Sequence, residues 1–151
     1  MIRALNHVGV SVASLARSIP FYRDLLGMEV IREREFSGDP YEKILGLIGA
    51  RGKLAILQAG TMRIELFEFF HPTPKPAEHL RPVCDHGITH FCIEVSDVEQ
   101  EYERLSGAGV SFHCPPIEFS GVAKATYGRD PDGNVFELLE RSISSEDRPS
   151  G

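Results

Sequence analysis

Two histidines and two glutamates stand at corresponding places in the two halves of the sequence: His7 and Glu65 in the first, His90 and Glu137 in the second. Two imidazoles and two carboxylates form a mixed nitrogen and oxygen ligand set, which suits a divalent first-row metal ion. A single histidine on a strand is more often an ordinary packed or exposed residue. The repetition of the pair is what favours a metal site here.

The segments that carry the histidines have the alternating pattern of half-buried β-strands. In residues 6–12, His7 shares one face with Ser11 while valines occupy the other face, and in residues 87–95, His90 shares its face with Cys92. Successive side chains of a strand point to opposite faces, so each histidine lies opposite an apolar layer. The same alternation places Glu65 and Glu137 on the polar faces of their strands, which could line a cavity.

An internal repeat organises the whole chain. Each histidine strand runs into a helix signal, residues 14–27 and 97–107, which begins at a capping residue and ends at a glycine. Both halves then continue as strand, strand, strand, so both have the order βαβββ. His7 and Glu65 are 58 residues apart and His90 and Glu137 are 47 apart, which places an insertion in the first half.

The repeat divides the chain into two modules, residues 1–70 and 87–141, with a proline-rich connector at 71–86 and a flexible tail at 142–151. The insertion falls at 37–52, where the pattern fits a loop, a short helix or a mobile flap. If a pseudo-twofold axis relates the modules, the two pairs converge. The expected helices are 14–26 and 97–107, and the expected strands are 4–12, 28–36, 53–58, 62–70, 87–96, 110–113, 122–127 and 134–141.

Composition and charge restrict the possible partners. The 151 residues are 42% hydrophobic and 25% charged, as in an ordinary globular protein. A net charge of -6 argues against a nucleic-acid partner. No apolar segment approaches the length of a membrane span, and Met1 opens directly on a strand rather than on a signal peptide. The three cysteines lack a paired metal spacing, so reduced thiols in a cytoplasmic protein are expected.

Several of these motifs together resemble the vicinal oxygen chelate superfamily, which includes glyoxalase I, methylmalonyl-CoA epimerase, extradiol dioxygenases, and the bleomycin and fosfomycin resistance proteins. The resemblance covers about residues 4–141. It implies an α+β fold of two βαβββ modules that form a curved mixed sheet or open barrel around a metal cavity. The motifs that carry it are Asn6-His-Val-Gly-Val-Ser-Val, Ser18-Ile-Pro-Phe-Tyr-Arg-Asp-Leu-Leu-Gly, Ile64-Glu-Leu, Gly87-Ile-Thr-His and Asp130-Pro-Asp-Gly-Asn-Val-Phe-Glu-Leu.

The resemblance implies a metal-dependent isomerase, epimerase or lyase that moves a proton alpha to a carbonyl group of a small substrate chelated through vicinal oxygens. The metal ligands would be His7, Glu65, His90 and Glu137, with Glu65 and Glu137 as candidate bases. The ion could be Zn, Ni, Co, Mn or Fe, and a homodimer is expected from the family. Ser11 stands where glyoxalase I has an arginine that grips glutathione, which argues against glutathione as the substrate.

Two other functions are compatible with the resemblance. An extradiol-type dioxygenase would use Fe(II) on two histidines and one glutamate, and a fourth ligand at Glu65 argues against it. A binding protein of the bleomycin-resistance kind would not need a complete ligand set. Side chains near the proposed cavity are candidate substrate contacts, although packing or solvent contact is the commoner role for residues of these types. They are Ser11, Cys92, Phe67, Phe69, Tyr127 and Arg129, the last two as possible anion binders.

Overall fold

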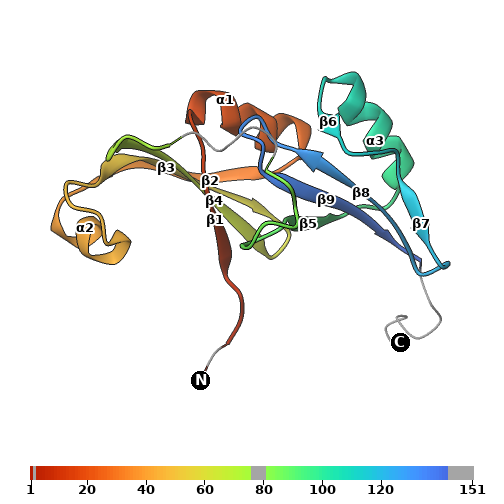
Figure 1. The fold of residues 1–151 in the computed structure, drawn as a ribbon, viewed down its shortest axis with the longest axis horizontal. Coiled ribbons are helices and arrows are strands. Elements are labelled where there is room, and N and C mark those ends of the chain that lie inside the picture. Colours follow the sequence, from red (N-terminus) through yellow and green to blue (C-terminus); the bar gives the residue numbers. More distant parts are fainter. Residues whose placement is uncertain (2, 76–80, 143–151) are drawn as a thin grey trace. The chain divides into compact units, whose positions relative to one another are not determined.

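The computed structural model describes residues 1, 3–75 and 81–142, shown as a coloured ribbon in Figure 1. Most of the predicted tail and residues 76–80 of the predicted connector lie outside these described residues. The chain divides into two compact units, Met1–Glu78 and His79–Gly151. Each unit has its own sheet with a helix packed on it, and the two units are described separately.

The first unit is a four-stranded mixed sheet with the order β1-β4-β3-β2. Strand β1 runs parallel to β4, and the other pairs are antiparallel. Helix α1 packs on β3 and β4 through Leu15 and Ile19, both buried. The elements are β1 (His7–Ser11), α1 (Leu15–Pro20), the π-helical turn η1 (Phe21–Leu25), β2 (Glu29–Ser37), α2 (Asp39–Leu45), β3 (Arg51–Ala59) and β4 (Met62–His71).

The second unit repeats this plan. Its sheet has the order β5-β9-β8-β6, with β7 also paired to β8, and β5 runs parallel to β9. Helix α3 packs on β8 and β9 and buries Val98 and Leu105. The elements are β5 (Phe91–Glu94), α3 (Val98–Gly107), β6 (Ser111–Phe112), β7 (Ile117–Phe119), β8 (Ala123–Arg129) and β9 (Val135–Arg141). The predicted α+β class with two mixed sheets is confirmed.

Local chemistry explains where the elements differ from expectation. The predicted helix at 14–26 changes to a π-helical turn directly after Pro20, a residue that cannot donate a backbone hydrogen bond. Residues 39–45 of the insertion form helix α2, with Pro40 in its first turn and Gly46 as a left-handed C-cap. Strand β7 was not predicted. It is joined to β8 by a three-residue connection, residues 120–122, in which Ser120 and Gly121 both have positive φ.

A glutamate near the end of the last strand caps the helix of the same unit. Glu68 Oε2 accepts a hydrogen bond of 2.9 Å from the backbone N–H of Leu15, the first residue of α1. Glu140 Oε2 accepts one of 2.9 Å from Val98 N–H, the first residue of α3. A carboxylate at a helix N-terminus satisfies an otherwise unpaired donor and complements the helix dipole. The repeat therefore extends to the way each helix is fastened to its sheet.

None of the helices within residues 3–75 and 81–142 is both long enough and apolar enough to cross a lipid bilayer.

Candidate metal centre

The first unit brings His7 and Glu65 together. His7 is the first residue of β1, and Glu65 lies in the middle of β4, which runs alongside. His7 Nε2 lies 3.5 Å from Glu65 Oε2, with 43% of the histidine side chain and 19% of the glutamate side chain exposed. The pair therefore meets at a solvent-accessible surface of its own sheet.

The second unit brings His90 and Glu137 together in the same way. His90 directly precedes β5, so the strand begins later than the alternating pattern predicted, and Glu137 lies in β9. His90 Nε2 lies 3.1 Å from Glu137 Oε2, and about a quarter of the histidine side chain is exposed. The pair is shorter and more enclosed than its counterpart in the first unit.

The register of the strands is the same around both pairs. Glu65 is paired with Gly9 across the parallel ladder, and Glu137 is paired with Cys92. In each unit the histidine stands two residues before the residue that pairs with the glutamate. Since residues two apart on a strand share a face, both histidines lean toward their glutamates by the same geometry.

The other ring nitrogen of each histidine is held by the residue that precedes it. His7 Nδ1 lies 3.1 Å from Asn6 Oδ1, and His90 Nδ1 lies 2.9 Å from Thr89 Oγ1. When Nδ1 carries the proton and donates to this oxygen, the lone pair of the ring is on Nε2, the nitrogen nearest the glutamate. This is how outer-shell hydrogen bonds fix metal-binding histidines. Each unit thus brings together one imidazole and one carboxylate, donor types that suit a divalent first-row ion.

The surroundings of the second pair contain two polar side chains that the first pair lacks. The Tyr127 ring lies against the His90 ring with centroids 4.6 Å apart. Cys92 lies beside Glu137, and partial loss of water around the thiol, followed by the charge of Glu137, raises the pKa of Cys92 to about 12. The thiol therefore stays protonated and is a poor nucleophile. Burial and the same carboxylate also raise the pKa of Tyr127.

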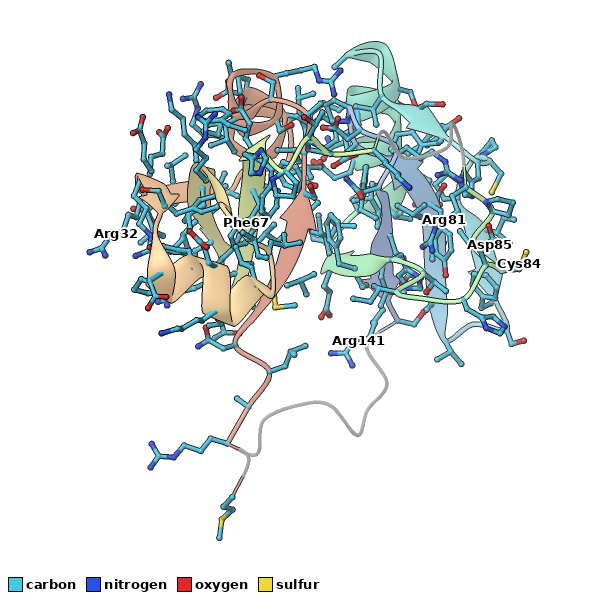
Figure 2. The ribbon with its side chains drawn as sticks, turned by 60° about the vertical axis from the view of Figure 1, so that its left-hand side comes forward. Arg32, Phe67, Arg81, Cys84, Asp85 and Arg141 are labelled. Carbon is cyan, nitrogen blue, oxygen red and sulfur yellow. The ribbon has the colours of Figure 1, made fainter. Side chains whose placement is uncertain are left out.

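The predicted contacts of the first unit lie on β1 and β4. Ser11 is exposed and pairs with Phe67 across the ladder. Because serine is uncharged, this position offers no cation to a substrate. The rings of Phe67 and Phe69 stack with centroids 5.9 Å apart, and both meet the edge of the buried Phe36 ring. Figure 2 labels Phe67 on the first sheet. The phenylalanines thus form an aromatic wall on the face that carries Glu65.

Arg129 has protein partners for three of its nitrogens. Its Nε donates to His113 Nε2 at 3.1 Å, Nη1 to the Gly133 carbonyl at 2.8 Å and Nη2 to the Arg81 carbonyl at 3.1 Å. Arg81, labelled in Figure 2, belongs to the loop that precedes β5. The guanidinium therefore ties that loop and the final turn to β8, while anion binding by Arg129 stays a prediction.

A second group of acidic residues in the described part of the chain also has ligand atoms close together: Asp97, Glu99 and Glu140. Each of them has a structural partner. Asp97 accepts from Gln100 N–H, Glu140 caps Val98, and Glu99 pairs with Lys124 at 2.7 Å. These contacts fasten α3 to its sheet, so the cluster is explained without an ion.

Two features of the site were missed by sequence reasoning. Asn6 and Thr89 were not assigned a role, although each directly precedes a histidine and the repeat itself places them in equivalent positions. Glu68 and Glu140 were predicted only to lie on the other face or at strand ends. Their capping role depends on contacts across 53 and 42 residues of sequence, which parity does not reveal.

Comparison with known proteins places these observations in a family context. The sequence model of the Glyoxalase/Bleomycin resistance protein/Dioxygenase superfamily matches residues 4–138. Lactoylglutathione lyase GLX1 of Arabidopsis thaliana is 27% identical over 146 residues, which are 95% of this chain and 46% of that protein. The chain thus spans less than half the length of this plant relative.

Two further proteins are similar over most of both chains. Metallothiol transferase FosB of Staphylococcus saprophyticus is 29% identical over 140 residues, 91% of this chain and 77% of that one. The crystal structure of a glyoxalase family protein from Bacillus cereus has a TM-score of 0.87 at 21% identity and covers 95% of this chain and 97% of its own. The latter likeness shows a shared fold.

Proposed function

Since the chain belongs to the Glyoxalase/Bleomycin resistance protein/Dioxygenase superfamily, we propose that it is a divalent-metal-dependent enzyme that transfers a proton alpha to a carbonyl group. The substrate is a small molecule that presents two vicinal oxygens. Similarity to a lactoylglutathione lyase supports an enzyme of this general class. The single observation that carries the proposal is the repeated histidine–glutamate pair with the histidine fixed at Nδ1.

The proposed metal ligands are His7, Glu65, His90 and Glu137. When bound, a dication withdraws electron density from the substrate's vicinal oxygens and so acidifies the adjacent C–H bond. Asn6 and Thr89 hold the imidazoles in the tautomer that offers Nε2. Nitrogen and oxygen ligands of this kind suit Zn, Ni, Co, Mn or Fe, and the proposed ion is one of these.

A glutamate of the site serves as the base. Glu65 and Glu137 are both less than a fifth exposed, so each carboxylate is partly shielded from water and yet reaches the cavity side of its sheet. A carboxylate within reach of the substrate's C–H removes the proton and returns it to the neighbouring carbon or oxygen. Glu137 is the stronger candidate because Tyr127 and the protonated Cys92 flank it with uncharged groups.

Glutathione is disfavoured as part of the substrate. The first strand carries the small, neutral Ser11 where the family's glutathione-dependent enzymes use an arginine, and the described structure pairs Ser11 with an aromatic residue. A negatively charged tripeptide would need a cation at that place. We therefore propose a substrate without a glutathionyl group.

Metal dependence and solvent exchange test the proposal. Protein purified without a nickel column is analysed for bound metal, stripped with a chelator, and reloaded with Ni, Co, Mn, Zn or Fe(II). In D₂O, a carbonyl substrate is expected to gain deuterium at the alpha carbon only with the metal-loaded protein. Metal-independent exchange, or no exchange by any metal form across a panel of vicinal-oxygen carbonyl compounds, would contradict proton transfer.

Two alternatives give different results in the same assays. An extradiol dioxygenase would consume oxygen with catechols when loaded with Fe(II), without alpha-deuterium exchange. A binding protein would retain ligands but turn over none of them. Similarity to metallothiol transferase FosB adds thiol transfer as a second candidate function, and consumption of a free thiol by the metal-loaded protein would identify it.

A further inference from the structure

The second unit contains a cavity of about 210 Å³ that has Glu137 among its lining residues. It opens between β8, β9 and the short strand β7, which lies on the other side of β8 from β9. The proposed base is thus part of the cavity wall. The remaining lining decides what kind of group can lie next to the reacting atoms.

Most of the lining is apolar. Ile117 and Phe119 of β7 and Ala125 and Tyr127 of β8 supply aliphatic and aromatic surface. Ile117 and Phe119 are 51% and 56% exposed, which is unusual for large apolar side chains on a strand. An apolar ligand group in the cavity would cover the part of these side chains that faces inward, and that burial would favour binding.

Two polar side chains in the lining, Thr126 and His113, have protein partners. Thr126 Oγ1 donates to the Cys114 carbonyl at 2.6 Å. His113 Nε2 accepts from Arg129, and burial together with that neighbouring cation lowers the pKa of His113, so the imidazole is neutral at pH 7. Apart from Glu137, the lining therefore carries no charge and offers little for a charged substrate group to bind.

We propose that this cavity receives an uncharged apolar group, about the size of a phenyl ring, that the substrate carries next to its chelating oxygens. A cavity of about 150 Å³ lined by apolar side chains accommodates benzene, so the space here is sufficient. The inference rests on the proposed function, because it is Glu137 that connects the cavity to the metal. Ile117, Phe119 and Ala125 are then the residues that determine specificity.

Two chelators that differ only in their apolar group test the inference. Benzohydroxamate and acetohydroxamate present the same vicinal oxygens, one with a phenyl ring and the other with a methyl group. Their affinities for the cobalt(II)-loaded protein are measured by isothermal titration calorimetry. We expect benzohydroxamate to bind at least about tenfold more tightly, from the extra apolar surface that it buries.

Variants locate the source of this preference. Ala125→Leu fills the cavity and should abolish the preference for the phenyl ring while leaving acetohydroxamate unchanged. Phe119→Glu places a charge in the wall at a half-exposed position, where folding tolerates it, and should weaken benzohydroxamate selectively by about fivefold or more. Val122→Glu is the matched control, since Val122 is exposed on the same hairpin but is not part of the lining.

The outcomes separate the two proposals. Cobalt-dependent binding of both hydroxamates with equal affinity, or a preference that survives in Phe119→Glu as it does in Val122→Glu, would overturn the apolar subsite and leave the metal site standing. Hydroxamate binding that does not depend on cobalt would overturn the proposed function itself. If Ala125→Leu does not fold, the Phe119→Glu and Val122→Glu pair still decides the question.

Discussion

In the first unit Glu65 lies between Gly9 and Ile56 across its sheet, whereas in the second unit Glu137 lies between Cys92 and Tyr127. The strand order, the parallel pair and the register are the same in both units. What differs is the chemistry of the neighbouring side chains. The shared features are those that the fold and the proposed metal require, and the differing ones shape the surroundings of a substrate.

Each unit also contains elements that have no counterpart in the other. The first unit gains helix α2 and the ring cluster of Phe36, Phe67 and Phe69, with Tyr41 of α2 against Phe36 at 5.3 Å. The second unit gains strand β7 and the cavity that ends at Glu137. The two units therefore share the histidine–glutamate pair and differ at their periphery. This comparison yields three predictions, in order of decreasing effect.

The largest effect is expected from removing a histidine of either pair. If one ion is shared, His7→Ala and His90→Ala each lower metal affinity by more than about 100-fold, because a direct ligand contributes more than its outer-shell partner. Competition with a fluorescent chelator measures the affinity. His86→Ala, an exposed histidine of the loop before β5, is the control. Wild-type affinity in either ligand variant would mean that one unit binds metal by itself.

A smaller effect is expected from the residues that hold Nδ1. Thr89→Val removes the acceptor for His90 and should weaken metal binding by about 10- to 100-fold, while Thr89→Ser keeps the hydroxyl and most of the affinity. Asn6→Leu should have the weaker effect of the two, because the His7 side chain is 43% exposed and water can replace the amide. Equal affinity of Thr89→Val and Thr89→Ser would show that the hydroxyl plays no part.

The smallest effect concerns stability and separates the two helix caps. Ser14 at the N-cap of α1 makes no side-chain capping bond, so Glu68 carries that function, whereas Asp97 already caps α3 alongside Glu140. Removing Glu140 also relieves repulsion from Asp97 and Glu99. Glu68→Ala should therefore cost about 1–2 kcal/mol of unfolding free energy and Glu140→Ala less than about 1.

Urea unfolding of the two variants measures this difference, with Glu68→Gln as the variant that keeps an acceptor oxygen. A larger loss for Glu140→Ala than for Glu68→Ala would show that the asymmetry in capping does not govern the stability of the units.

The sequence predicted those parts of the molecule that follow from periodicity and repetition. The alternation around His7 and His90 has a period of two, and the repeat pairs each with a glutamate of matching parity. The same two-residue alternation of side chains also predicted most strands of both sheets. Pattern reasoning worked here because a strand face is determined locally.

The parts that it missed depend on contacts between distant residues. The capping by Glu68 and Glu140, the three partners of Arg129 and the cavity beside Glu137 arise only when the strands are in place. Strand β7 was overlooked because it is short and follows two prolines, although the Ser120-Gly121 dipeptide is a hairpin signal.

X-ray absorption spectroscopy of the cobalt(II)-loaded wild-type protein tests the central proposal most directly, because it counts the imidazoles bound to the ion. The account predicts one ion per chain with scattering from two imidazoles, and from one imidazole in whatever metal His90→Ala retains. A wild-type spectrum without imidazole scattering, or with a single imidazole at each of two ions per chain, would contradict the proposed set of four ligands.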